Sequence, residues 1–400
     1  MYYYLRKKKY DIFDVVWKSL WNIVTTFRWQ HHWDITKTKK ITFDIRARVW
    51  DAVVNKPLII LFSKYLKEEL WLDIEILVET SEYNDFVFRD ENFGKYYSLQ
   101  KFQNDDDSHT TLLKYFKTRI STFKLNKCKQ RDKSLVYIAS SPSHIIKNNW
   151  VAVSTNIYLD NYLLDFSLRG SANWYSRHVL LNTIEILVNY FKIPEFWDYI
   201  NNNLNIFYAD YNESNKSWIL IFVWNKEFRN LTIQKRYDLI LWISKHYKRK
   251  KIVIIDDNLN NLYNRLKNYK YQSNVHFVEN KFSIDEFKDY AKTFELIIWW
   301  DGGGFNYIRT VTNSIWIYTV ADPNKWHIFS WRNEYKKWRL FKRYSGYRIN
   351  LDGKRFGYIC KNSRILPSYD YSVGSGYFDD LPVNEFVKFT RSVISDEMKN

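Results

Sequence analysis

The chain contains little cysteine, and its thiols are far apart. Cys128 and Cys360 are the two cysteines among 400 residues, too few for a disulfide framework or a closed zinc site. The eight histidines show no metal-ligand spacing; His31 and His32 adjoin, and adjacent side chains on a helix point apart. The sequence therefore predicts no structural metal.

Long hydrophobic runs are also absent. No apolar run approaches the ~18 residues that a membrane-spanning helix needs. The N-terminal sequence MYYYLRKKKYDIFD is basic, but neither the apolar core nor the cleavage site of a signal peptide follows it. We therefore expect a cytoplasmic protein, whose attachment to a membrane would be peripheral.

Positive charge and aromatic residues are abundant instead. Lys and Arg number 61 against 44 Asp and Glu, a net charge of +17, which favours polyanionic partners such as nucleic acid, an anionic membrane or a phosphorylated saccharide. Aromatic residues make up 19% of the chain, with 18 Trp and 32 Tyr. Their rings stack on bases or sugars and anchor proteins at membrane interfaces. An AT-rich genome would also raise Lys, Asn and Tyr, but it does not explain Trp.

The length predicts two domains. Residues 1–40 form a basic, aromatic N-terminal extension, in which the apolar residues of Ile12 to Phe27 recur at helical spacing. That segment is either a helix lying on an anionic membrane or a helix packing on its own domain or a neighbouring subunit.

Residues 41–200 alternate strand and helix, which is typical of a Rossmann-like domain. The predicted elements are a strand and turn in ITFDIRARVW, a helix in DAVVNKPLIILFSKYLKEEL with Pro57 at or near its first turn, a strand in DIEILVE, a polar irregular region 81–133, strands at 134–140 and 162–167, and a helix 177–191 ended by Pro194.

Residues 201–215 are polar and rich in Asn, and we interpret them as a linker. A second Rossmann-like domain, 216–378, follows it. Its predicted elements are the strands WILIFVW, KKIVIID and VHFVE, the helices TIQKRYDLILWISKHY, LNNLYNRLKN and SIDEFKDYAKTF, and a basic, aromatic, turn-rich insertion 331–378. Residues 379–400 contain a final helix, predicted over 383–398.

One segment of the second domain combines several signals. In LIIWWDGGGFNYIRTVTNSIWIYTV an apolar run, Leu296 to Trp300, is followed by an acidic residue and three glycines. A segment with helical spacing and a second apolar run, Ile315 to Val320, come next, so we predict a strand–turn–helix–strand unit. Such a turn is either a phosphate-binding turn at the edge of a parallel sheet or merely a turn.

With both halves placed, the chain resembles the ADP-heptose:lipopolysaccharide heptosyltransferases, a bacterial glycosyltransferase family (GT9). ITFDIRARVWDAVVNKPL resembles the family's first strand and loop, and FRNLTIQKRYDLI its Lys-x-x-Pro helix start. LIIWWDGGGFNYIRTVTNSIWIYTVADPNKW resembles its Asp-Ser/Thr-Gly-x-x-His segment and ends in Asp322, Pro323 and Trp326. The resemblance covers about residues 40 to 330. It implies the GT-B fold, two doubly wound Rossmann-type domains facing each other across a cleft.

The chain departs from the family's pattern at several motif positions. The Gly before Asp51 is Trp50, and the motif's Lys and Pro are Arg229 and Thr232. In the Gly-rich turn the Ser/Thr is Gly302 and the His is Asn306.

The resemblance implies a role for each matching residue. Asp51 would be the general base; otherwise it caps a helix. Arg229, with Lys226 as a substitute, would stabilise the donor's diphosphate, unless it is a solvated cation. The remaining donor-binding candidates are Asp301, Gly302, Gly303, Gly304, Asn306 and Asp322, where Asp301 holds sugar hydroxyls or orders the turn. Arg177 and His178, at the start of the helix predicted over 177–191, are acceptor-binding candidates; otherwise His178 has a structural role.

The function implied is that of an inverting, metal-independent glycosyltransferase. It would move a sugar, heptose first, from a nucleotide-diphosphate sugar such as ADP-heptose to a bacterial surface glycan, lipooligosaccharide or capsule. The expected partners are that donor and an anionic glycan or glycolipid, with the protein in the cytoplasm or peripheral to the inner membrane. No cofactor is expected. Two alternatives are a degenerate, non-catalytic glycan-binding or scaffold protein and a nucleic-acid-binding protein, against which the dispersed basic residues argue.

Overall fold

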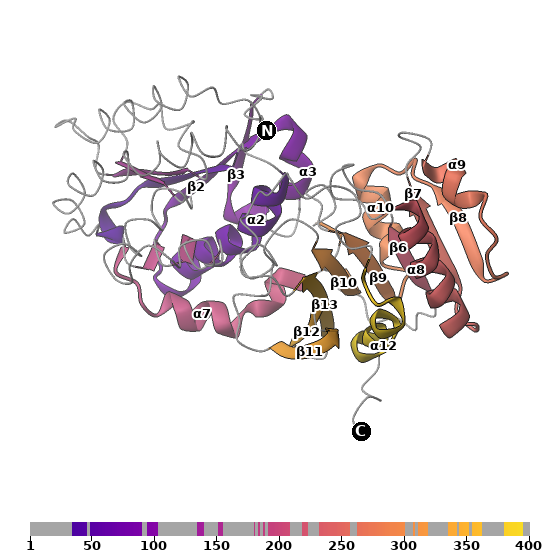
Figure 1. The fold of residues 1–400 in the computed structure, drawn as a ribbon. Coiled ribbons are helices and arrows are strands. Elements are labelled where there is room, and N and C mark those ends of the chain that lie inside the picture. The colour runs from indigo at the N-terminus through magenta and orange to yellow at the C-terminus, as the bar shows by residue number, and fades with distance from the viewer. Residues whose placement is uncertain are drawn as a thin grey trace, which may run out of the picture. The chain divides into compact units, whose positions relative to one another are not determined.

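We analysed a computed structural model of the chain. It describes residues 34–45, 49–89, 94–102, 134–139, 151–154, 180, 183–184, 187–188, 191–208, 218–222, 232–256, 262–300, 307–308, 311–318, 335–341, 344–351, 354–361 and 380–394. The chain divides into two compact units, Met1–Phe207 (unit 1) and Tyr208–Asn400 (unit 2). Each contains one sheet (Figure 1).

Unit 1 is built on a parallel sheet with the strand order β3-β2-β1-β4-β5. Its elements are η1 (Ile35–Lys37), β1 (Lys40–Ile45), α2 (Val49–Lys64), η2 (Tyr65–Glu69), β2 (Glu75–Ser81), η3 (Glu82–Asn84), α3 (Asp85–Phe88), η4 (Gly94–Tyr96), β3 (Ser98–Phe102), β4 (Leu135–Ala139), β5 (Val151–Ser154), α7 (Phe196–Asn202) and η8 (Leu204–Tyr208), the last of which reaches the start of unit 2. The predicted strands in ITFDI, DIEILVE and SLVYIAS are confirmed.

Helix α2 is confirmed, but the predicted place of Pro57 is wrong. Pro57 lies well inside the helix rather than near its first turn. Proline lacks the N–H that would bond to the carbonyl four residues earlier, so an interior position is normally unfavourable. Here the helix is buried on most sides, with Leu58, Leu61 and Phe62 fully buried, and this tertiary packing outweighs the local preference.

The sequence predicts an irregular region over 81–133, and this is wrong for part of it. Within it α3 and β3 form, and β3 pairs in parallel with β2 from Leu77↔Ser98 to Ser81↔Phe102. The strand was missed because it lies at the edge of the sheet: its residues are exposed or half-buried, so it lacks the apolar run of a central parallel strand. The predicted strand at 162–167 lies outside the described residues.

The helix predicted at 177–191 is helical at each described position from Leu180 to Phe191. Those positions are all buried and follow the helical repeat: Leu180, Thr183, Ile184, Leu187, Val188 and Phe191. The ring of Phe62 lies 5.8 Å from that of Phe191 and 5.4 Å from that of Phe196, so this helix, α2 and α7 share one core. Residues 201–208, predicted as irregular linker, are the end of α7 and the turn η8.

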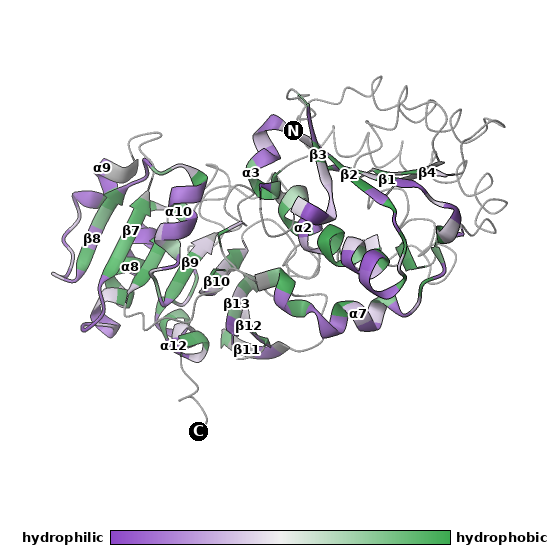
Figure 2. Ribbon diagram, turned by 180° about the vertical axis from the view of Figure 1, so that it is seen from behind, coloured by the Kyte–Doolittle hydropathy of each residue, from purple (hydrophilic) through white to green (hydrophobic). Residues whose placement is uncertain are grey.

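Unit 2 is built on a sheet of eight strands in the order β11-β12-β13-β10-β9-β6-β7-β8. Its elements are β6 (Ile219–Phe222), α8 (Ile233–His246), β7 (Ile252–Asp256), α9 (Leu262–Lys267), β8 (Val275–Glu279), α10 (Ile284–Ala291), β9 (Leu296–Trp300), β10 (Asn313–Tyr318), β11 (Tyr335–Phe341), β12 (Tyr344–Leu351), β13 (Lys354–Lys361) and α12 (Val383–Ile394). The predicted strands and helices from WILIFVW to LIIWW and the final helix are confirmed. Figure 2 shows strands such as β7 and β9 in green, the colour of hydrophobic residues.

The two units repeat one strand order. In unit 2, β8-β7-β6-β9-β10 follows the same sequence of crossovers as β3-β2-β1-β4-β5 in unit 1, and every neighbouring pair among these strands is parallel. This is the Rossmann order, in which the chain reverses its direction of sheet growth between the first and fourth strands. The predicted fold class, α/β with two Rossmann-type units, is confirmed.

The predicted helix between β9 and β10 is not seen at the positions that the structure describes. Tyr307 and Ile308 form a turn, and Val311 and Thr312 a bend. Val311 donates its N–H to the carbonyl of Ile308 at 3.2 Å, a turn-type bond. The apolar spacing that suggested a helix instead reflects two buried side chains, Ile308 and Val311, both fully buried.

The segment 331–378 was predicted to be a turn-rich insertion, and this is wrong for its described part. Strands β11, β12 and β13 form an antiparallel meander, and β13 joins the main sheet in parallel with β10. Antiparallel strands with a partly exposed face alternate polar and apolar residues, which resembles an irregular basic stretch when only composition is considered.

Helix α12 covers this meander and also contacts α8 (Figure 1). Arg348 and Arg355 donate to the last carbonyls of α12, at Ser392 (2.9 Å) and Ile394 (2.7 Å). These bonds satisfy acceptors that a helix end leaves without partners. In the described part of the chain, no helix is long and apolar enough to cross a membrane.

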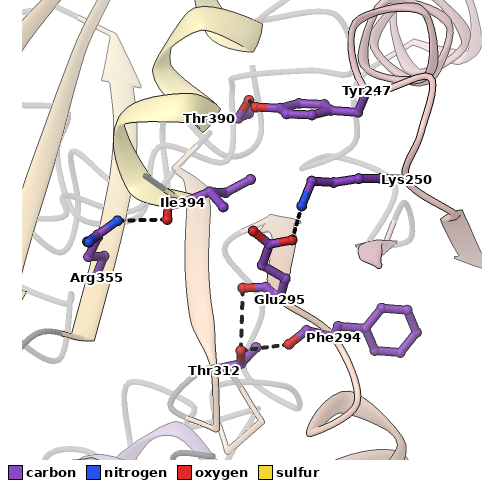
Figure 3. Close-up of polar contacts among 8 residues, drawn as sticks. All are labelled: Tyr247, Lys250, Phe294, Glu295, Thr312, Arg355, Thr390 and Ile394. Atoms are coloured by element: carbon purple, nitrogen blue, oxygen red, sulfur yellow. Dashed lines mark hydrogen bonds and ion pairs between the residues drawn. The ribbon is translucent and has the colours of Figure 1, made fainter. Parts of the chain in front are cut away.

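A polar network closes the amino-terminal edge of the unit 2 sheet (Figure 3). Lys250, just before β7, pairs with Glu295, just before β9. The hydroxyl of Thr312 donates to the carbonyl of Phe294 at 2.7 Å, and Tyr247 at the end of α8 bonds to Thr390 of α12. These contacts join five elements, β7, β9, β10, α8 and α12, near one edge of the sheet.

Candidate functional site

The candidate site in unit 2 follows from which strands are neighbours. Strands β6 and β9 lie side by side in parallel, in register from Ile219↔Leu296 to Ile221↔Ile298, at the point where strand order reverses. In open parallel sheets, ligands bind outside the carboxyl ends of the strands at such a reversal. Strand β6 ends at Phe222 and β9 at Trp300, so segments 223–231 and 301–306 begin at this edge.

The predicted donor-binding residues belong to the segments that leave this edge. Lys226 and Arg229 follow β6, Asp301 to Gly304 and Asn306 follow β9, and Asp322 follows β10. All of them lie outside the described residues. The topology therefore gives the strand ends from which they start, and their side chains stay predictions.

Three aromatic rings form a floor beneath this edge. Phe222 and Trp299, near the ends of β6 and β9, stack with centroids 4.1 Å apart and planes 7° apart. Phe287 of α10 lies 5.8 Å from Phe222 and 6.0 Å from Trp299. All three side chains are buried. Tight aromatic packing fixes the two strand ends, which is what a ligand-binding edge needs, and the sequence signal was an aromatic residue at the end of each apolar run.

Helix α10 also holds the segment that follows the glycines. The Nζ of Lys288 donates to the hydroxyl of Tyr307 at 3.2 Å and lies 4.6 Å from the centre of its ring. Tyr307 directly follows Asn306. The pair therefore ties the end of the Gly-rich segment to a helix, a contact that sequence reasoning missed.

The start of α8 is placed as the motif predicted. Thr232, at the position of the motif's Pro, is the N-cap, and its hydroxyl accepts the N–H of Lys235 at 3.3 Å. The helix therefore begins directly after the segment that carries Lys226 and Arg229. Its unpaired N–H groups and dipole favour an anion at this edge.

In unit 1, Asp51 lies near the start of α2, the helix that follows the first strand of its sheet as α8 follows β6 in unit 2. It is in the first turn of α2, which follows β1, and β1 and β4 flank the reversal of strand order in that sheet. Because α2 begins at Val49, Asp51 is inside the helix rather than at its N-cap. Its side chain, like Arg177 and His178, lies outside the description.

Two further carboxylates lie near this edge of unit 1 and were not singled out from sequence. Asp44 of β1 and Glu79 of β2 are register partners, and both are fully buried. Asp44 and Glu79 each have an interaction partner, as burial of a polar side chain requires. Acidic residues inside otherwise apolar strands were the available signal. Across the described ranges, no group of three or more His, Cys, Asp or Glu side chains is arranged to hold a metal ion.

Comparison with known proteins gave no match in sequence. No protein-family model and no curated protein matches the chain. Among solved structures, it is similar to ADP-heptose lps heptosyltransferase II of E. coli, with a TM-score of 0.48 and 8% identity over 89% of this chain and 98% of that one.

Two other solved structures have comparable TM-scores and identities. Heptosyltransferase WaaC of E. coli with ADP has a TM-score of 0.45 and 10% identity over 72% of this chain and 89% of that one. A glycosyl transferase family 9 protein of Veillonella parvula has a TM-score of 0.43 and 10% identity over 73% and 84%. All three are glycosyltransferases.

Proposed function

We propose that this chain is an inverting glycosyltransferase that moves a sugar from a nucleotide-diphosphate donor to an acidic bacterial surface glycan, such as lipooligosaccharide or capsule. The observation that carries the proposal is in unit 2: the cationic segment 223–231 and the Gly-rich segment 301–306 leave the carboxyl ends of two adjacent strands at the reversal of strand order. Heptose from ADP-heptose is the first donor to test, following the sequence resemblance.

The donor half of the mechanism uses the residues of these segments. As the bond between the anomeric carbon and the diphosphate oxygen breaks, negative charge develops on the leaving nucleoside diphosphate. Arg229, with Lys226, stabilises that charge, together with the N-terminus of α8. The backbone of Gly302, Gly303 and Gly304 approaches the phosphates closely, Asp301 and Asn306 bind sugar hydroxyls, and Asp322 completes the donor site. Fixed cations take the role that a metal ion has in other transferases.

The acceptor half uses unit 1. An acceptor hydroxyl attacks the anomeric carbon from the side opposite the diphosphate, which inverts the configuration. Asp51 takes the proton of that hydroxyl as the new carbon–oxygen bond forms. Arg177 and His178 orient the acidic acceptor. The products are the extended glycan and a nucleoside diphosphate, and the charge of +17 suits an anionic acceptor.

The decisive test is donor binding by calorimetry, with ADP-, GDP-, UDP- and CMP-sugars in turn. We expect one nucleotide class to bind and Arg229→Ala to weaken it by about 2 kcal/mol, roughly thirtyfold, because a charged partner of the diphosphate is removed. Arg265→Ala, an exposed arginine of α9, is the matched control and leaves the affinity unchanged.

Two results would contradict the proposal. Failure of all four donor classes to bind would favour a non-catalytic glycan-binding or scaffold protein. Tight, salt-sensitive binding of arbitrary oligonucleotides without donor binding would favour a nucleic-acid-binding protein.

A further inference from the structure

A second cationic feature of unit 2 lies away from the proposed donor edge. The end of α8 and the following turn read KHYKRKK, residues 245–251, which hold five Lys and Arg. Lys250 forms an ion pair with Glu295, and the Nζ of Lys251 lies 4.2 Å from the centre of the Trp218 ring. The remaining three, Lys245, Lys248 and Arg249, are exposed.

These three cations have no acidic neighbour along the chain. Between residues 232 and 251 the one acidic residue is Asp238, and its carboxylate accepts the side-chain amide of Gln234 at 2.9 Å. No ion pair involves Lys245, Lys248 or Arg249 within the described part of the structure. Their charge is therefore available to an anionic partner.

A large aromatic side chain is exposed beside them. Trp242 lies about one helical turn before Lys245 and is 50% exposed, and among the described residues it is one of three large hydrophobic side chains that are exposed. Leu241 next to it is half-buried. Tryptophan at such a place is typical of the boundary between water and lipid, where its ring is apolar and its N–H stays hydrated.

The neighbourhood is cationic on a second element as well. His246 follows Lys245, and burial together with the charge of Arg391 on α12 holds the pKa of His246 below its usual value. Arg391 is itself exposed. We name Trp242, Lys245, Lys248 and Arg249 the Trp242 surface.

The position of the Trp242 surface separates it from the donor site. Residues 245–251 precede β7, so they lie at the amino-terminal edge of the sheet, whereas the donor-binding segments leave the carboxyl-terminal edge. The proposed transferase mechanism does not use this surface, and a ligand there would leave the donor edge accessible.

We propose that the Trp242 surface docks unit 2 on an anionic lipid membrane, with the three cations at the headgroups and the Trp242 ring inserted between them. Each Lys or Arg near such a surface contributes about 1 kcal/mol. A membrane fits better than a nucleic acid, because the nearby rings that would stack on bases stack on each other: Tyr237 and Tyr269 lie 4.6 Å apart, and Tyr271 packs against Tyr237 at 5.4 Å. The inference does not depend on the transferase activity.

The test is co-sedimentation of the full chain with phosphatidylcholine vesicles that contain about 30% phosphatidylglycerol, a lipid of the anionic class. We expect binding that is lost in pure phosphatidylcholine and weakened by salt. The double variant Lys248→Glu/Arg249→Glu lowers the partition coefficient by at least about thirtyfold, and Trp242→Ala by about tenfold.

The matched control is Lys336→Glu/Lys337→Glu, which makes the same change in net charge at two exposed lysines of β11. Equal loss of binding in both double variants would mean that net charge alone drives adsorption, and it would overturn the proposal. So would full binding of Trp242→Ala and of the Lys248/Arg249 variant. If an oligonucleotide binds more tightly than the vesicles and is lost with the same variants, the surface is a nucleic-acid site. Because donor binding is measured without lipid, failure here leaves the transferase proposal untouched.

Discussion

At the scale of single residues, two glycines decide how α12 packs on the added strands. A Cβ on Gly346 of β12 would lie 2.8 Å from a ring carbon of Phe389, and one on Gly357 of β13 would lie 3.0 Å from a methyl group of Val393. Phe389 is fully buried. The absence of side chains on two neighbouring strands therefore creates the space that the helix fills.

Gly346→Ala should destabilise the protein. The added methyl group overlaps a buried ring that cannot move freely, and overpacking of this kind costs about 1 to 3 kcal/mol. Urea unfolding followed by circular dichroism measures the change in the free energy of unfolding. Gly94→Ala is the control, since a Cβ there meets nothing within 4 Å; equal effects of the two substitutions would contradict the packing argument.

At the scale of elements, a buried carboxylate fastens the edge strand of unit 1. Asp85, the first residue of α3, is 1% exposed. Its carboxylate forms an ion pair with the Nζ of Lys101 on β3 at 2.9 Å and a second ion pair with Arg89. Burial raises the pKa of Asp85, but the bonds from Lys101 and Arg89 outweigh it and hold that pKa below its usual value. The ionised form is therefore the one that the fold stabilises.

Asp85→Asn should lower the free energy of unfolding at pH 7 by about 1 to 2 kcal/mol, because both charge-assisted bonds are weakened while Lys101 and Arg89 return largely to water. Since the folded-state pKa is lowered, the contribution of Asp85 is present above the unfolded-state pKa of about 4 and is lost as the pH falls through the folded-state value. The difference between wild type and variant should thus shrink below pH 4.

Denaturant titrations at several pH values would measure this difference. Asp73→Asn is the matched control, because Asp73 is exposed and has no ion pair among the described residues. A gap between Asp85→Asn and wild type that is constant with pH would show that packing, and not ionisation, is what the substitution disturbs.

The elements that the sequence predicted are those with apolar runs or strong helical repeats. β6, β7 and β9 are buried parallel strands, and α8 and α10 begin at side-chain caps, Thr232 and Ser283. The sequence did not predict β3 or the strands of the meander, because edge and antiparallel strands have polar residues on one face. One available signal was overlooked: β12 and β13 are separated by Asp352 and Gly353 alone, a pair that favours a two-residue hairpin loop.

At the scale of the whole molecule, the strand order brings motifs that are distant in sequence to neighbouring strands, and this defines the candidate site. Motif positions that are 72 residues apart in sequence, such as Arg229 and Asp301, follow adjacent strands because β9 lies beside β6. Spacing along the chain could not establish this adjacency, since it depends on which way each crossover turns. The orientation of the site side chains, which sequence also could not give, stays a prediction.

The same topology puts the Lys250–Glu295 pair and the proposed donor-binding segments at opposite edges of the unit 2 sheet. The pair Lys250–Glu295 lies at the amino-terminal edge, partly buried, with side-chain exposures of 28% and 19%. Glu295→Gln should therefore lower the free energy of unfolding by about 1 to 2 kcal/mol, because it leaves a half-buried ammonium without its carboxylate. Donor affinity should stay unchanged, since the binding segments begin at the far ends of the strands.

Two measurements on one variant check this separation: urea unfolding and calorimetry with the donor that wild type binds. Glu279→Gln is the matched control, because its partner Lys281 is 79% exposed and such a pair contributes at most about 0.5 kcal/mol. Arg229→Ala should show the reverse pattern, weak donor binding with near-normal stability. If Glu295→Gln weakened donor binding as much as it lowered stability, the two edges would be coupled through the strands, and the donor site would depend on the packing of the whole sheet rather than on the loops that leave its carboxyl edge.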